Sequence, residues 1–216
     1  MKRFYKMIAP IVLVIVSIPE NSDATWIFEL FGGSVYNVTT PLHIRQSGYD
    51  EIKLNARYET EPFDPPLYYD MRIARWKNNC GWEFEFIHQK LFLENEPVEV
   101  QNFSITHGYN LFTINRGWKH KVFILHVGAG IVLTHPETTI REKRYSETKG
   151  IFHKGYYISG PVIQGAIGKR FNFYRNLYLT IEGKLTGSYT RIPIQGGNAI
   201  VPNVAIHGLF GLGYSF

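Results

Sequence analysis

The last fourteen residues, from Asn203 to Phe216, alternate bulky apolar side chains with mostly small ones. Successive side chains of a β-strand point to opposite faces, so this pattern predicts one strand with a bulky apolar face and a smaller face. The smaller face also carries His207. Such a strand places its bulky face either against a protein core or against lipid. The bulky set is Val204, Ile206, Phe210, Leu212, Tyr214 and Phe216.

Residues 1–24 have the layout of a signal peptide. Three basic residues precede an apolar run from Met7 to Ile18, and the tripeptide Ser22-Asp23-Ala24 fits a small-x-small cleavage site. The apolar run is too short to span a bilayer comfortably. We therefore expect an exported protein with one mature domain, residues 25–216. An uncleaved anchor helix is the alternative.

Seven further segments alternate apolar and polar residues with a period of two and are separated by turn residues. With the last strand they predict eight strands, the first beginning at Glu51. The region 26–46 is less regular and is either a two-stranded addition, which makes ten strands, or a segment outside the sheet wall. The seven segments are 51–58, 67–76, 82–93, 102–114, 121–133, 156–172 and 177–189.

Composition narrows the class of protein. Aromatic residues make up 15% of the chain and there are 20 glycines, which suits closed β structure. The mean hydropathy of −0.15 is compatible with membrane-crossing strands, because only every second residue of such a strand faces lipid. The single cysteine, Cys80, excludes an intrachain disulfide. The net charge of +5 accompanies no nucleic-acid motif, and no cofactor motif is present.

The signal peptide, the alternating strands, the long 134–155 loop and the terminal aromatic residue together resemble small bacterial outer-membrane β-barrel proteins. The resemblance implies an all-β, antiparallel, up-and-down transmembrane barrel in the outer membrane. It also implies that Tyr214 and Phe216 act as a C-terminal signal for the barrel-assembly machinery. An exported soluble β-sandwich or lipocalin-like barrel is the alternative, with the bulky faces as an ordinary core.

An eight-stranded barrel has a narrow lumen, so its inward polar side chains are expected to fill it. A switch of the apolar parity within 82–93 predicts a β-bulge in that strand. The expected lumen network comprises Glu51, Lys53, Arg57, Glu83, Glu85, His88, Lys90, His126, Glu182, Lys184 and His207.

Some of these side chains are also candidates for catalysis, namely His88, His107, His126, Glu182 and Ser104. No spacing matches a known catalytic or metal-binding motif, so no metal site is assigned. His107 falls on the apolar parity of its strand, which we expect to face lipid. A bulge near Thr106 that turns His107 inward is the favoured explanation.

The sequence therefore predicts an outer-membrane protein with a structural or surface-interaction role and a plugged lumen. Two alternatives stay open: an acyl hydrolase or transferase acting on lipid A, and a narrow pore. Outer-membrane lipid and lipopolysaccharide are the expected partners, and a monomer is expected. The basic residues of the long loop are candidates for contacts with lipopolysaccharide phosphates: Arg141, Lys143, Arg144 and Lys149.

Overall fold

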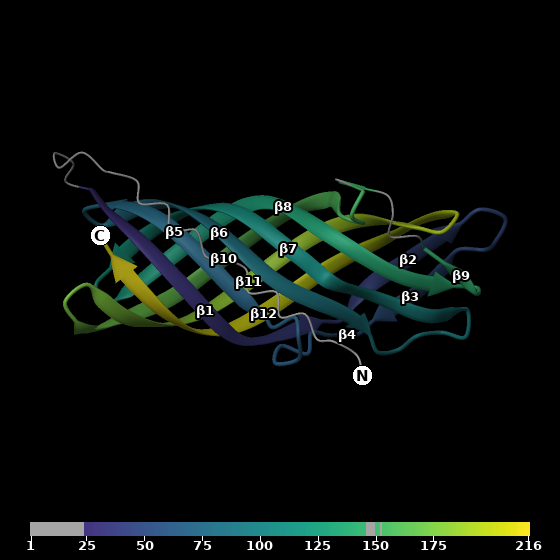
Figure 1. The fold of residues 1–216 in the computed structure, drawn as a ribbon, viewed down its shortest axis with the longest axis horizontal. Coiled ribbons are helices and arrows are strands. Elements are labelled where there is room, and N and C mark those ends of the chain that lie inside the picture. Colours follow the sequence, from purple (N-terminus) through teal and green to yellow (C-terminus); the bar gives the residue numbers. More distant parts are fainter. Residues whose placement is uncertain (1–23, 146–149, 152) are drawn as a thin grey trace, which may run out of the picture.

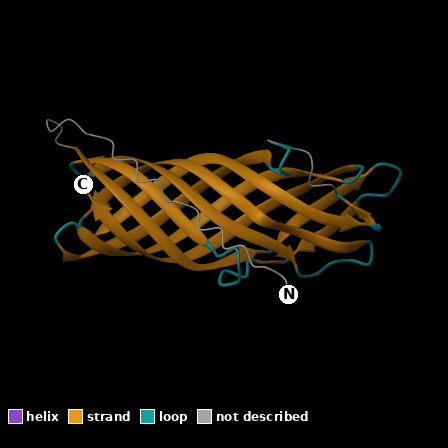
Figure 2. Cartoon of the chain, viewed as in Figure 1, coloured by secondary structure: helices purple, strands orange, loops and turns teal. Residues whose placement is uncertain are grey.

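The computed structural model describes residues 24–145, 150–151 and 153–216, and the predicted signal peptide therefore lies outside the described residues except for Ala24. The described part contains strands, turns and loops, and no helix in it is long and apolar enough to cross a bilayer (Figure 2). In chain order the strands are β1 (Ala24–Val38), β2 (Thr40–Gln46), β3 (Ile52–Ala56), β4 (Tyr58–Glu59), β5 (Tyr69–Lys77), β6 (Cys80–Leu93), β7 (Val100–His120), β8 (Phe123–Ile140), β9 (Lys143–Arg144), β10 (Tyr157–Tyr174), β11 (Leu177–Ile194) and β12 (Gly197–Ser215).

Eight of these strands close into an antiparallel barrel (Figure 1). The ring runs β1-β5-β6-β7-β8-β10-β11-β12, and β12 pairs back to β1 from Ile27↔Ser215 to Val38↔Val204. The amide of Phe216 donates to the carbonyl oxygen of Trp26 at 2.8 Å, which ties the last residue to the first strand. The predicted fold class and the count of eight strands are confirmed.

The prediction of which strand comes first is wrong. β1 is the first wall strand, whereas β2 and β3 form a hairpin that pairs only with the start of β12. Gly32-Gly33 lies in the middle of β1, within the region 26–46 whose alternation is less regular. In the barrel, β1 passes unbroken through these glycines. A side chain on Gly33 would overlap the carbonyl oxygen of Gly208, so only glycine fits at this position. Glycine therefore permits the close pairing of β1 with β12.

An apolar belt surrounds the outside of the barrel. Its side chains point away from the lumen and are exposed, which matches the lipid-facing band of an outer-membrane barrel. We use "belt" for Phe28, Leu30, Ile73, Trp82, Phe84, Ile114, Leu125, Val127, Ile131, Ile163, Ile167, Ile181, Leu185, Ile206, Phe210 and Leu212.

The barrel interior changes in character along its length. Glu83 and Glu85 of β6 point inward at the level of the belt, and Ile87, Leu91 and Leu93 point inward beyond it. The odd-numbered residues of β6 thus point inward on both sides of the predicted bulge. The β6–β7 register does shift between Gln89 and Leu91, but the extra residues lie on β7, so the side chains of β6 do not change face. The apolar residues beyond the belt form an ordinary buried core, since the outside of the barrel there is polar. This core also includes Leu42, Ile44, Phe103, Ile105, Tyr109, Leu111, Ile140, Ile192 and Val201.

We call this second part of the barrel the cap: the β2–β3 hairpin, β4, β9 and the wall strands beyond the belt. The opposite end, where β1 begins and Phe216 lies, is the terminal end (Figure 1). Three short turns connect the wall strands at the terminal end, at 78–79, 121–122 and 175–176.

Candidate functional site

The lumen at the level of the belt is filled by an ion network centred on Arg72. The Nη2 atom of this guanidinium lies 2.5 Å from Glu85 Oε1 and 2.7 Å from Glu182 Oε1. Its Nη1 atom lies 3.2 Å from Glu29 Oε2. All four side chains are at most 1% exposed. A buried cation with several carboxylate partners satisfies the rule that buried charges are paired and hydrogen-bonded.

Further groups extend this network across the lumen. Lys184 pairs with Asp70 and lies 2.7 Å from Glu85 Oε1, and Arg170 Nε lies 2.9 Å from Glu29 Oε1. His126 contributes its Nδ1 atom, 2.7 Å from Glu83 Oε2. The described residues thus bring five carboxyl groups together with three permanent cations and one imidazole. Members come from β1, β5, β6, β8, β10 and β11, so the network crosses the lumen from wall to wall.

Six of the predicted lumen residues point into the barrel interior. Glu83, Glu85, His126, Glu182 and Lys184 are in the ion network. His207 lies nearer the cap, where its Nδ1 atom is 3.1 Å from the Tyr68 hydroxyl and its Nε2 atom is 3.0 Å from Thr186 Oγ1. The sequence interpretation missed Glu29, Asp70 and Arg72. Asp70 and Arg72 lie on the polar parity of β5, so the alternation alone was enough to find them.

Three predicted lumen residues, Glu51, Lys53 and Arg57, are outside the lumen. They belong to the hairpin end and the segment after it, and Lys53 and Arg57 are 62% and 63% exposed. The Glu51 carboxylate accepts a bond from Arg45 Nε at 2.8 Å. Hydrogen bonds from Arg45 and then Lys53 lower the pKa of Glu51 to about 2. The hairpin turns its apolar face, including Leu42 and Leu54, toward the core of the cap, so the alternating Lys53 points to solvent.

Two more, His88 and Lys90, are buried but do not face the lumen. His88 shares the outward parity of Phe84 and Phe86, stacks on Tyr69 and has its Nδ1 atom 2.7 Å from Asn110 Oδ1. It lines a surface cavity of about 470 Å³ just beyond the belt. Lys90 lies where the β6–β7 register shifts and donates to the carbonyl oxygen of Asp64 at 2.9 Å. The loop before β5 covers it.

His107 lies in a bulge, as predicted, but the bulge turns it outward. Ile105 pairs with Pro136 and Tyr109 with Thr134, so residues 106–108 face His135 alone. The side chain of His107 is 61% exposed, and its Nδ1 atom is 2.7 Å from Glu137 Oε1. The predicted inward orientation of His107 is wrong. His107 lies just beyond the belt, where an outward polar side chain is compatible with the edge of a lipid-facing band.

The five catalytic candidates do not converge. His126 and Glu182 lie together inside the barrel, with Nε2 and Oε2 3.5 Å apart. His88 and His107 lie on the outer surface. Ser104 donates to the carbonyl oxygen of Glu137 at 3.3 Å, so its hydroxyl has no imidazole partner among its described hydrogen bonds. These positions do not form the nucleophile, base and acid arrangement of a hydrolytic triad.

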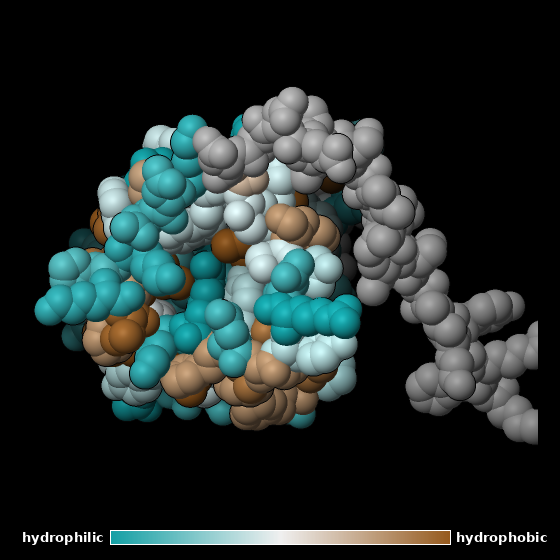
Figure 3. All heavy atoms as spheres, turned by 90° about the vertical axis from the view of Figure 1, so that its left-hand side faces the viewer, coloured by the Kyte–Doolittle hydropathy of each residue, from teal (hydrophilic) through white to brown (hydrophobic). Residues whose placement is uncertain are grey.

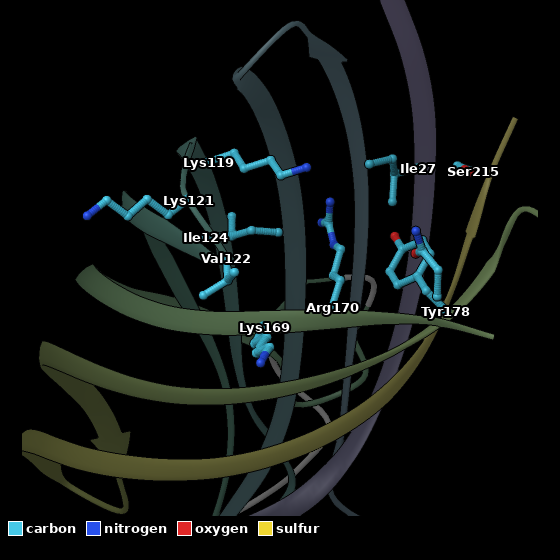
Figure 4. Close-up of a pocket in the computed structure, with 10 residues that line it drawn as sticks. Ile27, Lys119, Lys121, Val122, Ile124, Lys169, Arg170, Tyr178 and Ser215 are labelled. Atoms are coloured by element: carbon cyan, nitrogen blue, oxygen red, sulfur yellow. The ribbon is translucent and has the colours of Figure 1, made fainter.

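The terminal end has a polar mouth. Figure 3 looks onto this end and shows a central hollow with hydrophilic residues in its depth. A cavity of about 390 Å³ opens there, and Arg170 and Tyr178 form part of its wall (Figure 4). Lys121 lines its rim, with the amine directed away from Arg170 (Figure 4). Arg170 is both a wall of this cavity and a member of the ion network, so the network closes the bottom of the mouth.

At the cap, the segment after β8 is fastened to the β2–β3 hairpin. Arg141 and Lys143 both lie over the ring of Tyr49, each 4.6 Å from its centroid. Arg141 also donates to Gln46 Oε1 at 3.1 Å and to the carbonyl oxygen of Asp50 at 3.0 Å. Of the other predicted loop residues, Arg144 is exposed in β9, and Lys149 lies outside the described residues.

No protein-family model matches this sequence, and no characterised protein matches it by sequence. Among solved structures, the chain is similar to the attachment invasion locus protein Ail of Yersinia pestis, with 13% identity, 89% of this chain and 98% of that chain covered, and a TM-score of 0.39. It is also similar to the outer membrane protease OmpT of Escherichia coli, with 10% identity, 89% and 96% coverage and a TM-score of 0.40. The closed antiparallel ring of eight strands and the apolar belt around it agree with the expected resemblance to small outer-membrane β-barrels.

Proposed function

We propose that this protein is exported, inserts into the bacterial outer membrane and acts at the cell surface through its cap rather than as a pore. The observation that carries the proposal is the filled interior. Charged side chains cross the lumen at the belt, and an apolar core fills it beyond the belt. Such a barrel offers water and solutes no continuous path through the lumen, so we place its function on the outer surface of the protein.

The proposed orientation puts the terminal end in the periplasm. Outer-membrane barrels have short periplasmic turns and longer extracellular connections. All three turns at the terminal end have two residues, whereas three of the four connections between wall strands at the cap are longer and only the β11–β12 turn, 195–196, is as short. In this orientation residues 1–24 act as the signal peptide. Tyr214 and Phe216 act as the signal for the assembly machinery. The cap then projects from the cell surface.

For the partner we propose phosphate groups of lipopolysaccharide. Arg45 and Lys143 are exposed basic side chains on the two parts of the cap that Tyr49 joins, and Arg45 is 57% exposed. A guanidinium binds phosphate oxygens through paired hydrogen bonds. Because Arg141 and Lys143 are held on the Tyr49 ring, the basic groups are positioned before a ligand arrives, which limits the entropy lost on binding.

The test is binding of the full-length protein in detergent to immobilised lipopolysaccharide, with dephosphorylated lipopolysaccharide as the control ligand. The double variant Arg45→Ala with Lys143→Ala is expected to bind at least about tenfold more weakly, since each hydrogen bond to a charged group is worth roughly 1.5 kcal/mol or more. The matched variant Lys119→Ala with Lys121→Ala removes two exposed lysines from the terminal end and is expected to bind as the wild type does. Equal binding by both double variants, or equal binding to the dephosphorylated ligand, contradicts the proposal.

A further inference from the structure

Two histidines and a carboxylate gather on the outer surface at the edge of the belt. His135 and Glu137 are two residues apart on β8, so their side chains leave the same face of the strand. The β7 bulge projects His107 from the neighbouring strand toward them. The potential ligand atoms of His107, His135 and Glu137 all lie within 4.8 Å of one another. We call these three residues the outer triad.

The backbone of the outer triad is held in place by its surroundings. The Tyr156 hydroxyl donates to the carbonyl oxygen of His107 at 3.2 Å, and the Tyr156 ring packs edge-on against His135 at 4.8 Å between centroids. Gly108 has a φ of 132°, a conformation that side-chain-bearing residues rarely adopt. The bulge thus depends on a glycine at 108 and on a contact from the segment before β10.

Each member of the outer triad is suited to coordinate a metal. Imidazole nitrogen and carboxylate oxygen are the ligands that Zn²⁺ and related divalent ions take from proteins. His107 is accessible, Glu137 is half-buried, and His135 forms the inner side of the group. The other cluster of three potential ligands in the described residues, Asp70, Glu85 and Glu182, differs because Arg72 and Lys184 already occupy its carboxylates.

We propose that His107, His135 and Glu137 bind a divalent transition-metal ion of the Zn²⁺ class on the outer surface of the barrel. Three protein ligands leave one position of a tetrahedral ion for water or another ligand. His107 and Tyr156 also line the 470 Å³ cavity that contains His88, so the site borders a hollow at the edge of the belt. The site is independent of the function proposed for the cap.

The test is titration of the full-length protein in detergent with Zn²⁺ by calorimetry and with Co²⁺ by visible absorption. The wild type is expected to bind one ion with the absorption bands of tetrahedral Co²⁺. His107→Ala, His135→Ala and Glu137→Gln are each expected to weaken binding by at least about tenfold, because loss of even an outer-shell partner costs about 10- to 100-fold. The matched control is His43→Ala, which removes a half-buried histidine that also pairs with a glutamate, Glu51.

Boiled and unboiled migration on a denaturing gel establishes that each variant is folded. If one alanine variant fails to fold, Glu137→Gln still decides, since it keeps the shape of the side chain. The proposal is overturned if the wild type binds no ion, or if folded triad variants bind as tightly as the wild type. It is also overturned if His43→Ala reduces binding as much as they do. Lipopolysaccharide binding by the triad variants separates this result from the fate of the cap proposal.

Discussion

Arg72 is the residue on which the lumen network depends most. Its guanidinium contacts carboxylates from β1, β6 and β11 and is 1% exposed. Removing one partner of a buried ion group is far more costly than removing an exposed one, because the remaining charges are left desolvated and uncompensated. The network therefore makes the stability of the whole barrel sensitive to one side chain.

Arg72→Met is expected to lower the free energy of unfolding by about 3 to 5 kcal/mol, the cost typical of breaking a buried ion group. The measurement is denaturant-induced unfolding of the barrel in lipid vesicles. Arg45→Met is the matched control. It removes an exposed arginine from the hairpin and is expected to change the same quantity by at most about 1 kcal/mol. An Arg72→Met barrel as stable as the control shows that the network does not hold the wall together.

At the scale of elements, the β2–β3 hairpin and β1 show where sequence analysis fails. A period of two identifies a strand with one wet face, and Ile52–Ala56 has such a face. The pattern does not say which strand is the neighbour, and pairing is what separates a wall strand from a hairpin. The Gly32-Gly33 step of β1 lies in the less regular region 26–46, where glycine weakens the strand pattern. Its close approach to Gly208 is a tertiary contact that no local pattern encodes.

The hairpin also has a testable dependence on pH. Hydrogen bonds from Arg45 and Lys53 lower the pKa of Glu51 from 4.5 to about 2. The charged form therefore stabilises the hairpin fully above pH 4.5, and this contribution is lost as the pH falls from about 4.5 through about 2.

We expect the carboxyl carbon of Glu51 to titrate in NMR spectra with a midpoint near 2, and near its ordinary value of 4.5 when Arg45 and Lys53 are both replaced by alanine. Added salt is expected to raise the wild-type midpoint, because the group is exposed to solvent. A wild-type midpoint that already lies at 4.5 rules out the pairing.

At the scale of the whole molecule, the barrel has two kinds of interior within one set of strands. The odd-numbered residues of β6 point inward throughout, yet they change from Glu83 and Glu85 to Ile87 and Leu91. The sequence alone suggested a bulge at this point, because apolar residues were expected to face lipid everywhere. In the structure the change coincides with the end of the belt, and in the proposed membrane orientation water rather than lipid surrounds the barrel beyond it. The polar filling at the belt was predictable from local alternation, whereas the count of eight strands agrees only because the predicted segment 51–58 took the place of β1.

The central claim is that this two-part interior closes the barrel. The measurement that tests it most directly is the conductance of the purified full-length protein in planar lipid bilayers. The ion network at the belt and the apolar core beyond it predict no conductance steps from the wild type. The wild-type protein is first shown to be folded by comparing its boiled and unboiled migration on a denaturing gel. Reproducible conductance steps from this folded protein contradict the claim. Such steps require a continuous water path past Arg72 and the apolar core.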